Sequence, residues 1–241
     1  MKKEIVMCTD DGIERGLSRI MTAQAANDTE VLTLGILAVD RSGSMREVRA
    51  ETEEALKAYL QDLRNDPNAR HILMSVISFA DTAIVEVPPM AATDLPESIP
   101  FRPHGNTRLY ATIAEVLESC LRQDDRQRAN GTPMRLVVVV VTDGGDNHAN
   151  GEENASHARE ARRRRLVTAA RTAQDRGHTL ITIGLNIDAE EIARLMGFPQ
   201  DSDHAITVKK NREGLRQTMT YTAASMVGVG GYPPRPSSTP R

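Results

Sequence analysis

Three short segments of the sequence combine acidic and hydroxyl side chains in a way that suits metal binding. Residues 40–44 (DRSGS) place one carboxylate and two hydroxyls in a single turn, residues 105–107 (GNT) add a third hydroxyl, and residues 142–145 (TDGG) add a second carboxylate. Small hard cations such as Mg2+ take oxygen ligands and keep part of their water. Because two carboxylates only balance a double charge, an ion held by this set would still attract a further anion.

The elements that must position these segments alternate between strand and helix. Nearly continuous apolar runs predict strands buried on both faces at 32–39, 72–79, 136–141 and 180–185, with a shorter strand near Ile206. Apolar residues at helical spacing predict helices over 48–63, 109–121, 155–176, 189–196 and 212–226. A strand at 83–87 follows its predecessor so closely that it should be antiparallel. This order predicts an α/β fold with a doubly wound, mostly parallel Rossmann-like sheet, one antiparallel edge strand, and helices on both faces.

The predicted fold brings the three segments to one place. Two of them directly follow strands, and the third precedes a helix. Open α/β sheets bind ligands beyond the carboxyl ends of their strands, where the strand order reverses. We therefore expect the segments to converge there, with helix N-termini behind Ser44 and Thr107 that help to hold negative charge.

In order and spacing, these residues resemble the metal-ion-dependent adhesion site of von Willebrand factor type A domains, whose pattern is Asp-x-Ser-x-Ser, a distant Gly-x-Thr, and Thr-Asp-Gly. Residues 77–81 (ISFAD) are similar to a stretch that these domains often carry after the second strand, and the resemblance covers roughly 33–226. It implies hydroxyl ligands from Ser42, Ser44 and Thr107, and direct or water-mediated binding of the ion by Asp40 and Asp143. It also implies Mg2+, or Mn2+ or Ca2+, as the ion, and a partner's Asp or Glu that displaces a metal-bound water.

The ends of the chain differ from its middle. We expect an N-terminal extension with a short helix at 1–30, the type A domain at 31–227, and a flexible tail rich in Pro, Gly and Ser at 228–241. No apolar run approaches the roughly 20 residues of a membrane span, and the N-terminal apolar stretch is too short for a signal peptide. The formal net charge of -3 gives no drive toward nucleic acid. The sequence therefore predicts a soluble, cytoplasmic protein that binds neither membrane nor nucleic acid.

The short length of the chain and its predicted cytoplasmic location also suggest which partners it binds. It resembles stand-alone bacterial type A proteins associated with tellurium-resistance-like systems, with protein kinases and phosphatases, or with MoxR-type ATPases. This resemblance implies a non-enzymatic adaptor within such an assembly.

Each candidate ligand also has a simpler interpretation. Residues 44–47 (SMRE) form a capping box, so Ser44 could only cap its helix, and Thr107 could cap another. Asp40, Ser42 and Asp143 could be ordinary turn residues. Each interpretation is sufficient for its own residue. Together they would require five residues to match the order of the metal-site pattern by coincidence.

Other features allow alternatives of lower weight. A second cation could bind to a group of polar residues after the Asp143 segment, namely Asp146, Asn147, Asn150, Glu152 and Glu153. Their spacing differs from that of an EF-hand loop, so the sequence mainly indicates a polar surface loop. Arg159 and residues 162–165 form a basic patch, which is usually a solvated face. His104 and His148 suit the rim of the site better than an all-oxygen metal shell.

The sequence also leaves one enzymatic function open. A metal-dependent phosphohydrolase with Asp40 as nucleophile remains the alternative function, although Ser42 stands where haloacid dehalogenase-type phosphatases carry a second aspartate. Hydrolase, dinucleotide-binding and Walker-type motifs are missing from the sequence.

Overall fold

The computed structural model describes residues 32–147 and 155–228. These residues contain a six-stranded sheet with the order β3-β2-β1-β4-β5-β6. The strands are β1 (Thr33–Asp40), β2 (Ile72–Phe79), β3 (Ala83–Ala91), β4 (Arg135–Thr142), β5 (Thr179–Leu185) and β6 (Ala205–Val208). All pairs are parallel except β2 with β3. The predicted doubly wound sheet with one antiparallel edge strand is confirmed.

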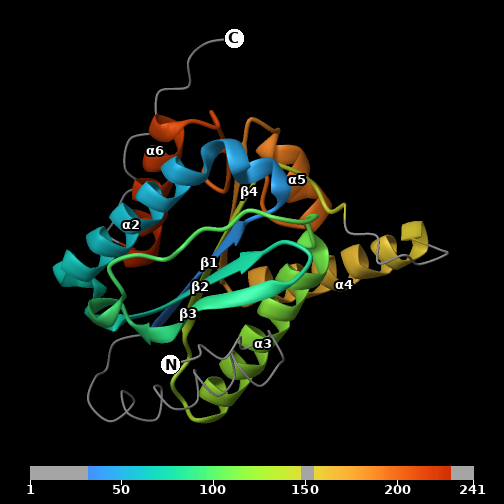
Figure 1. The fold of residues 1–241 in the computed structure, drawn as a ribbon. Helices are drawn as coiled ribbons and strands as arrows, with labels where there is room; N and C mark the ends of the chain where they lie inside the picture. Colours follow the sequence, from blue (N-terminus) through green and yellow to red (C-terminus); the bar gives the residue numbers. More distant parts are fainter. Residues whose placement is uncertain (1–31, 148–154, 229–241) are drawn as a thin grey trace, which may run out of the picture.

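Helices cover both faces of this sheet (Figure 1). They are α2 (Arg49–Asn65), α3 (Leu109–Ala129), α4 (Ala155–Asp175), α5 (Ala189–Met196) and α6 (Arg212–Val227), with short 3-10 helices at Gly43–Val48, Pro67–His71 and Ala92–Asp94. One core cluster joins the sheet to α3, α4 and α5, and the other joins it to α2 and α6. None of the described helices is long and apolar enough to cross a membrane.

The central strands show why the apolar runs are continuous. In β4, Val138 and Val140 pack into the first core cluster, whereas Val137, Val139 and Val141 pack into the second. A strand with helices on both faces must be apolar at every position, because alternate side chains point to opposite faces. In the strand order, β1 and β4 are the central pair, so the order reverses between them and the switch point lies at their carboxyl ends.

Three predicted boundaries were wrong. The helix predicted to end at 121 continues to Ala129 as α3, and the other two differ for local reasons. The antiparallel strand β3 runs to Ala91 rather than to 87, through Pro88 and Pro89. Its place at the edge of the sheet allows this, since an edge strand has amides that need no partner strand. The helix predicted from 48 begins at Arg49, because Gly43–Val48 forms a 3-10 helix instead.

Several predictions lie outside the described residues. They are the extension and helix at 1–30, the tail from 229 onward, and the loop residues His148, Asn150, Glu152 and Glu153.

Candidate metal centre

The two candidate carboxylates come from neighbouring parallel strands. Asp40 is the last residue of β1, and Asp143 directly follows β4. The two strands pair in register up to Val39 opposite Val141. Their carboxyl ends therefore place both aspartates at the same edge of the sheet, at the reversal of strand order, as the sequence predicts.

Asp40 is a fully buried carboxylate. Its Oδ1 accepts a hydrogen bond from the Ser42 amide at 2.8 Å, and its Oδ2 accepts one from the Thr142 hydroxyl at 2.7 Å. Burial raises the pKa of Asp40 to about 6, although these hydrogen bonds act to lower it. Both donors are neutral, so a cation beside Asp40 would relieve the cost of burying its charge.

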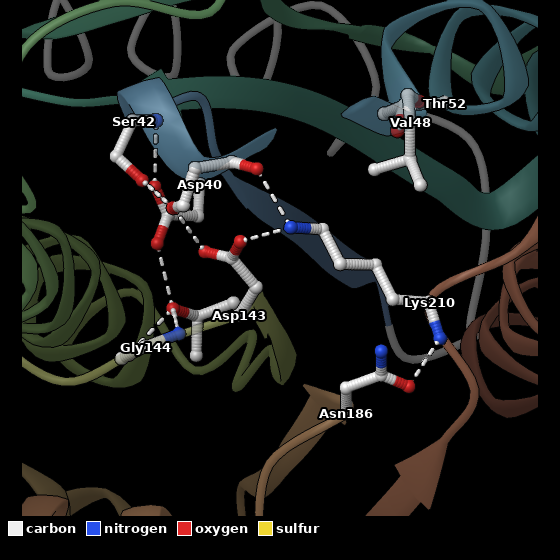
Figure 2. A network of polar contacts seen from close by, with 10 residues as sticks. Asp40, Ser42, Val48, Thr52, Asp143, Gly144, Asn186 and Lys210 are labelled. Atoms are coloured by element: carbon white, nitrogen blue, oxygen red, sulfur yellow. Dashed lines mark hydrogen bonds and ion pairs between the residues drawn. The ribbon is translucent and has the colours of Figure 1, made fainter. Parts of the chain in front are cut away.

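A chain of hydroxyls joins Asp40's turn to Asp143 (Figure 2). The Ser44 hydroxyl donates to Asp143 Oδ1 at 2.8 Å, and the Ser42 and Ser44 Oγ atoms lie 3.0 Å apart. Because Ser44 gives its only hydroxyl hydrogen to Asp143, Ser42 is the donor in the second contact. Two direct side-chain contacts thus link three of the predicted ligand residues through Ser44.

Thr107 is held against the same turn through backbone contacts. The Gly43 amide donates to the Gly105 carbonyl at 3.0 Å, which fixes the 105–107 segment beside Ser42 and Ser44. Thr107 itself is buried, and its amide donates to Asn147 Oδ1 at 2.6 Å. All five predicted residues therefore lie in the same region, with Thr107 placed there by its neighbours.

Lys210 is a component of this region that the sequence analysis missed. It lies between β6 and α6, and its Nζ donates to Asp143 Oδ2 at 2.7 Å and to the Ser44 carbonyl at 2.6 Å (Figure 2). Its only sequence signal is its position shortly after β6, which ends at Val208. The pair is largely withdrawn from solvent, with the Lys210 side chain 12% exposed and that of Asp143 3% exposed.

The capping interpretations of Ser44 and Thr107 were wrong. Ser44 lies inside the 3-10 helix Gly43–Val48 and bonds to Asp143, not to a helix amide. The N-cap residue of α3 is Arg108 and not Thr107, and the Tyr110 amide of its first turn donates to Asp146 Oδ1 at 3.1 Å. Helices do begin beside both residues, at Gly43 and at Leu109, and their help in holding negative charge stays a prediction.

Asp146 and Asn147 both contact the start of α3, but only Asp146 departs from the predicted polar surface loop, because it is buried whereas Asn147 is exposed. The Asp146 side chain is fully buried and lies 3.8 Å from Arg159 Nε, while Asn147 pairs with the backbone of Thr107. Their hydrogen bonds fix the start of α3 beside the 143–147 loop.

Arg41 and His104 brace the turn from its other side. Arg41 is buried, its Nη1 lies 2.6 Å from His104 Nδ1, and its Nη2 donates to the Thr82 carbonyl at 3.2 Å. His104 itself is exposed, in keeping with the rim position that we expected, and it contacts the buried Arg41 from there.

The basic patch is largely paired among the described residues. Arg163 and Arg164 contact Glu160, and Arg165 contacts Glu118. Arg159 lies 5.7 Å from the centre of the Tyr110 ring. These contacts favour a solvated face over a phosphate-binding site.

The donor set fits a hard divalent ion. Within the described ranges, no group of three or more His, Cys, Asp or Glu side chains is arranged to hold a metal ion. These residues therefore contain no cluster of nitrogen or sulfur ligands of the kind that zinc prefers. Two carboxylates and neighbouring hydroxyls are the oxygen donors that Mg2+ or Mn2+ accepts. The ammonium of Lys210 against Asp143 shows that this cluster already attracts positive charge.

The fold and the site together define a doubly wound domain with an acidic and hydroxyl-bearing cluster at its switch point. The family model of the von Willebrand factor type A domain matches residues 36–220, and the chain belongs to this family. A comparison with curated proteins found no match.

Solved structures share the fold at low sequence identity. The pilus adhesin SpaC from Lactobacillus rhamnosus GG, in an open conformation, is 14% identical with a TM-score of 0.58, over 83% of this chain and 30% of SpaC. The vWF domain of the type V pili tip protein Mfa5 from Porphyromonas gingivalis is 10% identical with a TM-score of 0.52, over 83% of this chain and 96% of that one.

A third structure carries a metal. Proximal thread matrix protein 1 from the mussel byssus, with a zinc-occupied MIDAS motif, is 14% identical with a TM-score of 0.51, over 83% of this chain and 47% of that protein. The chain thus spans less than half the length of SpaC and of the byssus protein.

Proposed function

We propose that this domain is a metal-dependent protein-binding module. Asp40, Ser42, Ser44, Thr107 and Asp143 would hold one divalent cation, with Mg2+ preferred and Mn2+ or Ca2+ as substitutes. The observation that carries the proposal is the convergence of these side chains at the carboxyl ends of β1 and β4, where the Ser44 hydroxyl bonds directly to Asp143. The zinc-occupied site of the byssus protein supports the same use of this fold.

When bound, the ion would supply an open coordination position for a carboxylate of the partner. The residues of this chain would position the ligands. The Thr142 hydroxyl and the Ser42 amide hold Asp40 in place, and Asn147 and Gly105 hold the Thr107 segment. We propose that the partner presents Asp or Glu and belongs to a cytoplasmic bacterial assembly of the tellurium-resistance-like kind, with a kinase, phosphatase or ATPase. The domain would act there as an adaptor and not as an enzyme.

The burial of Asp40 argues against the alternative function. A nucleophilic aspartate of a phosphohydrolase needs a carboxylate oxygen that the substrate can reach. Asp40 is fully buried, and each of its oxygens accepts a hydrogen bond from the chain. The geometry therefore favours a structural and metal-holding role over covalent catalysis.

The test is calorimetric titration of Mg2+, Mn2+ and Ca2+ into chelator-treated protein. Wild type should bind one ion, and Asp40→Ala and Asp143→Ala should lose at least tenfold in affinity while keeping the fold by circular dichroism. The matched control is Asp62→Ala, an exposed aspartate of α2. A phosphatase assay runs alongside, and metal-dependent turnover would favour the phosphohydrolase.

Partner capture is tested separately with an immobilised acidic peptide library. Binding should require metal, disappear with chelator, and be lost on substitution of peptide Asp or Glu by Asn or Gln. Binding that persists in chelator would contradict the proposal.

A further inference from the structure

The Lys210 ammonium lies where a cation of the site would be attracted. Its two acceptors, Asp143 Oδ2 at 2.7 Å and the Ser44 carbonyl at 2.6 Å, belong to two of the five proposed ligand residues. The other oxygen of Asp143 accepts from the Ser44 hydroxyl. Both carboxylate oxygens of Asp143 are thus engaged, and its charge is balanced from within the chain.

The backbone of Lys210 is fixed on both sides. Its amide donates to Asn186 Oδ1 at 2.8 Å, and the Asn186 amide donates to the Val208 carbonyl at 2.9 Å. The next residue, Asn211, caps α6 by accepting from the Gly214 amide at 2.9 Å. These contacts hold the backbone at the start of the Lys210 side chain (Figure 2), so a change in the position of the ammonium requires only side-chain rotation.

We propose that Lys210 is a tethered counter-cation that competes with the divalent ion for Asp143 and so weakens and tunes metal binding. The inference rests on the proposed metal site. A divalent ion that uses Asp143 must displace a charge-assisted hydrogen bond in a nearly dry environment, and an ammonium that stays close repels the ion. Both effects have the same sign, so removing the charge of Lys210 must strengthen metal binding.

The decisive variant is Lys210→Met, which keeps the length of the side chain and removes its charge. Its control is Lys209→Met, which removes the same charge from an exposed neighbour. In Mg2+ titrations of chelator-treated full chain, Lys210→Met should bind at least tenfold more tightly than wild type, equivalent to about 1.4 kcal/mol. Lys209→Met should stay within about twofold of wild type, because its charge is exposed and screened by solvent.

Thermal stability is a second readout, and its first comparison is made without metal. In chelator, Lys210→Met should unfold at a lower temperature than wild type and Lys209→Met, because Asp143 is left without its cation. Mg2+ should raise the midpoint of Lys210→Met more than that of wild type. If Lys210→Met does not fold, Lys210→Arg tests the same competition for Asp143. A guanidinium can form two parallel hydrogen bonds with a carboxylate, so this variant should bind Mg2+ more weakly than wild type.

The outcomes separate this inference from the proposed function. Equal Mg2+ affinity in wild type and Lys210→Met would overturn the competition and leave the metal site standing. Weaker binding in Lys210→Met would also overturn it, because Lys210 would then support the ion. Absence of Mg2+, Mn2+ and Ca2+ binding in both proteins would overturn the metal site and this inference together.

Discussion

The Thr142 hydroxyl is a central contact of the site although it is not one of the proposed ligands. It lies 2.7 Å from both Asp40 Oδ2 and the Gly144 carbonyl, and it accepts from the Gly144 amide at 3.2 Å. One side chain therefore fixes the buried carboxylate of β1 and the turn that carries Asp143.

Replacing Thr142 with valine should show what this hydroxyl contributes. Valine keeps the shape but leaves a buried carboxylate oxygen without its donor, a loss of about 1–3 kcal/mol in the free energy of unfolding. Urea denaturation in chelator measures the loss, and Thr142→Ser, which retains the hydroxyl, is the control. A valine variant as stable as the serine variant would contradict this role.

Sequence reasoning located the candidate ligands but not the residues that hold them. Asp40, Ser42, Ser44 and Asp143 share short motifs at strand ends, so their convergence follows from parallel strand geometry. Lys210 has no motif, and its reach to Asp143 depends on the length and path of one flexible side chain. Such contacts depend on packing, which local sequence patterns do not encode.

The loop before α3 contains a constraint that spacing alone does not reveal. Gly105 has φ of 69°, and a Cβ at this position would lie 1.8 Å from Asp81 Oδ2. Asp81 Oδ1 in turn accepts from the Asn106 amide at 3.0 Å. The glycine of the Gly-x-Thr motif therefore serves close approach to Asp81 as well as backbone conformation.

Gly105→Ala should be much more destabilising than Gly131→Ala. Gly131 also has positive φ, at 77°, but nothing lies within 4 Å of the Cβ it would gain. Gly131→Ala should cost only the strain of the left-handed conformation, about 1–2 kcal/mol, and Gly105→Ala should exceed it because Asp81 must move. Chemical denaturation measures the loss in the free energy of unfolding for each variant. Equal losses would contradict this expectation and show that the Asp81 side chain moves away at no cost.

The regular elements were predictable where periodicity was strong, and their ends were not. The valine run of β4 and the helical spacing of α3 gave the right elements. The 3-10 helix at Gly43–Val48 was missed because its turn is set by contacts with other segments, including that of the Gly43 amide with Gly105. Short irregular turns follow from tertiary contacts more than from their own residues.

At the scale of the whole molecule, metal binding and folding should be linked. The proposed ligands come from three distant segments that meet only in the folded chain. An ion that binds only the folded state stabilises it by about 2.7 kcal/mol at a concentration 100 times its Kd. Thermal unfolding should therefore shift upward with Mg2+ in wild type, and the shift should disappear in Asp143→Ala.

The opposite edge of the sheet carries a second buried charge cluster with a structural role. Asp124 of α3 is fully buried, and its Oδ2 lies 2.6 Å from Arg128 Nε, 3.2 Å from Arg176 Nη1 and 3.3 Å from His178 Nε2. Burial alone would raise the pKa of Asp124, but Arg128, His178 and Arg176 hold it below its usual value. The cluster ties the ends of α3 and α4 to the start of β5.

His178 should make the stability of the whole domain sensitive to mild acid. Burial lowers the pKa of His178 despite the nearby Asp124, and its Nδ1 accepts from the Leu136 amide at 3.4 Å, which requires the neutral ring. The unfolded chain therefore takes up the proton first as the pH falls through about 6.5. The free energy of unfolding should fall below that pH, by at most about 1.4 kcal/mol per pH unit for one proton, until the folded ring is also protonated.

Asp40 acts in the opposite direction over a similar range, because its folded pKa of about 6 exceeds its ordinary value and the folded chain takes up that proton first. The two effects are separated by comparing wild type with His178→Gln in urea titrations at pH 7, 6 and 5 in chelator. Both proteins contain Asp40, so the difference between them reports His178 alone. Wild type should lose stability relative to the variant as the pH falls, and parallel curves would show that His178 keeps its ordinary pKa in the fold.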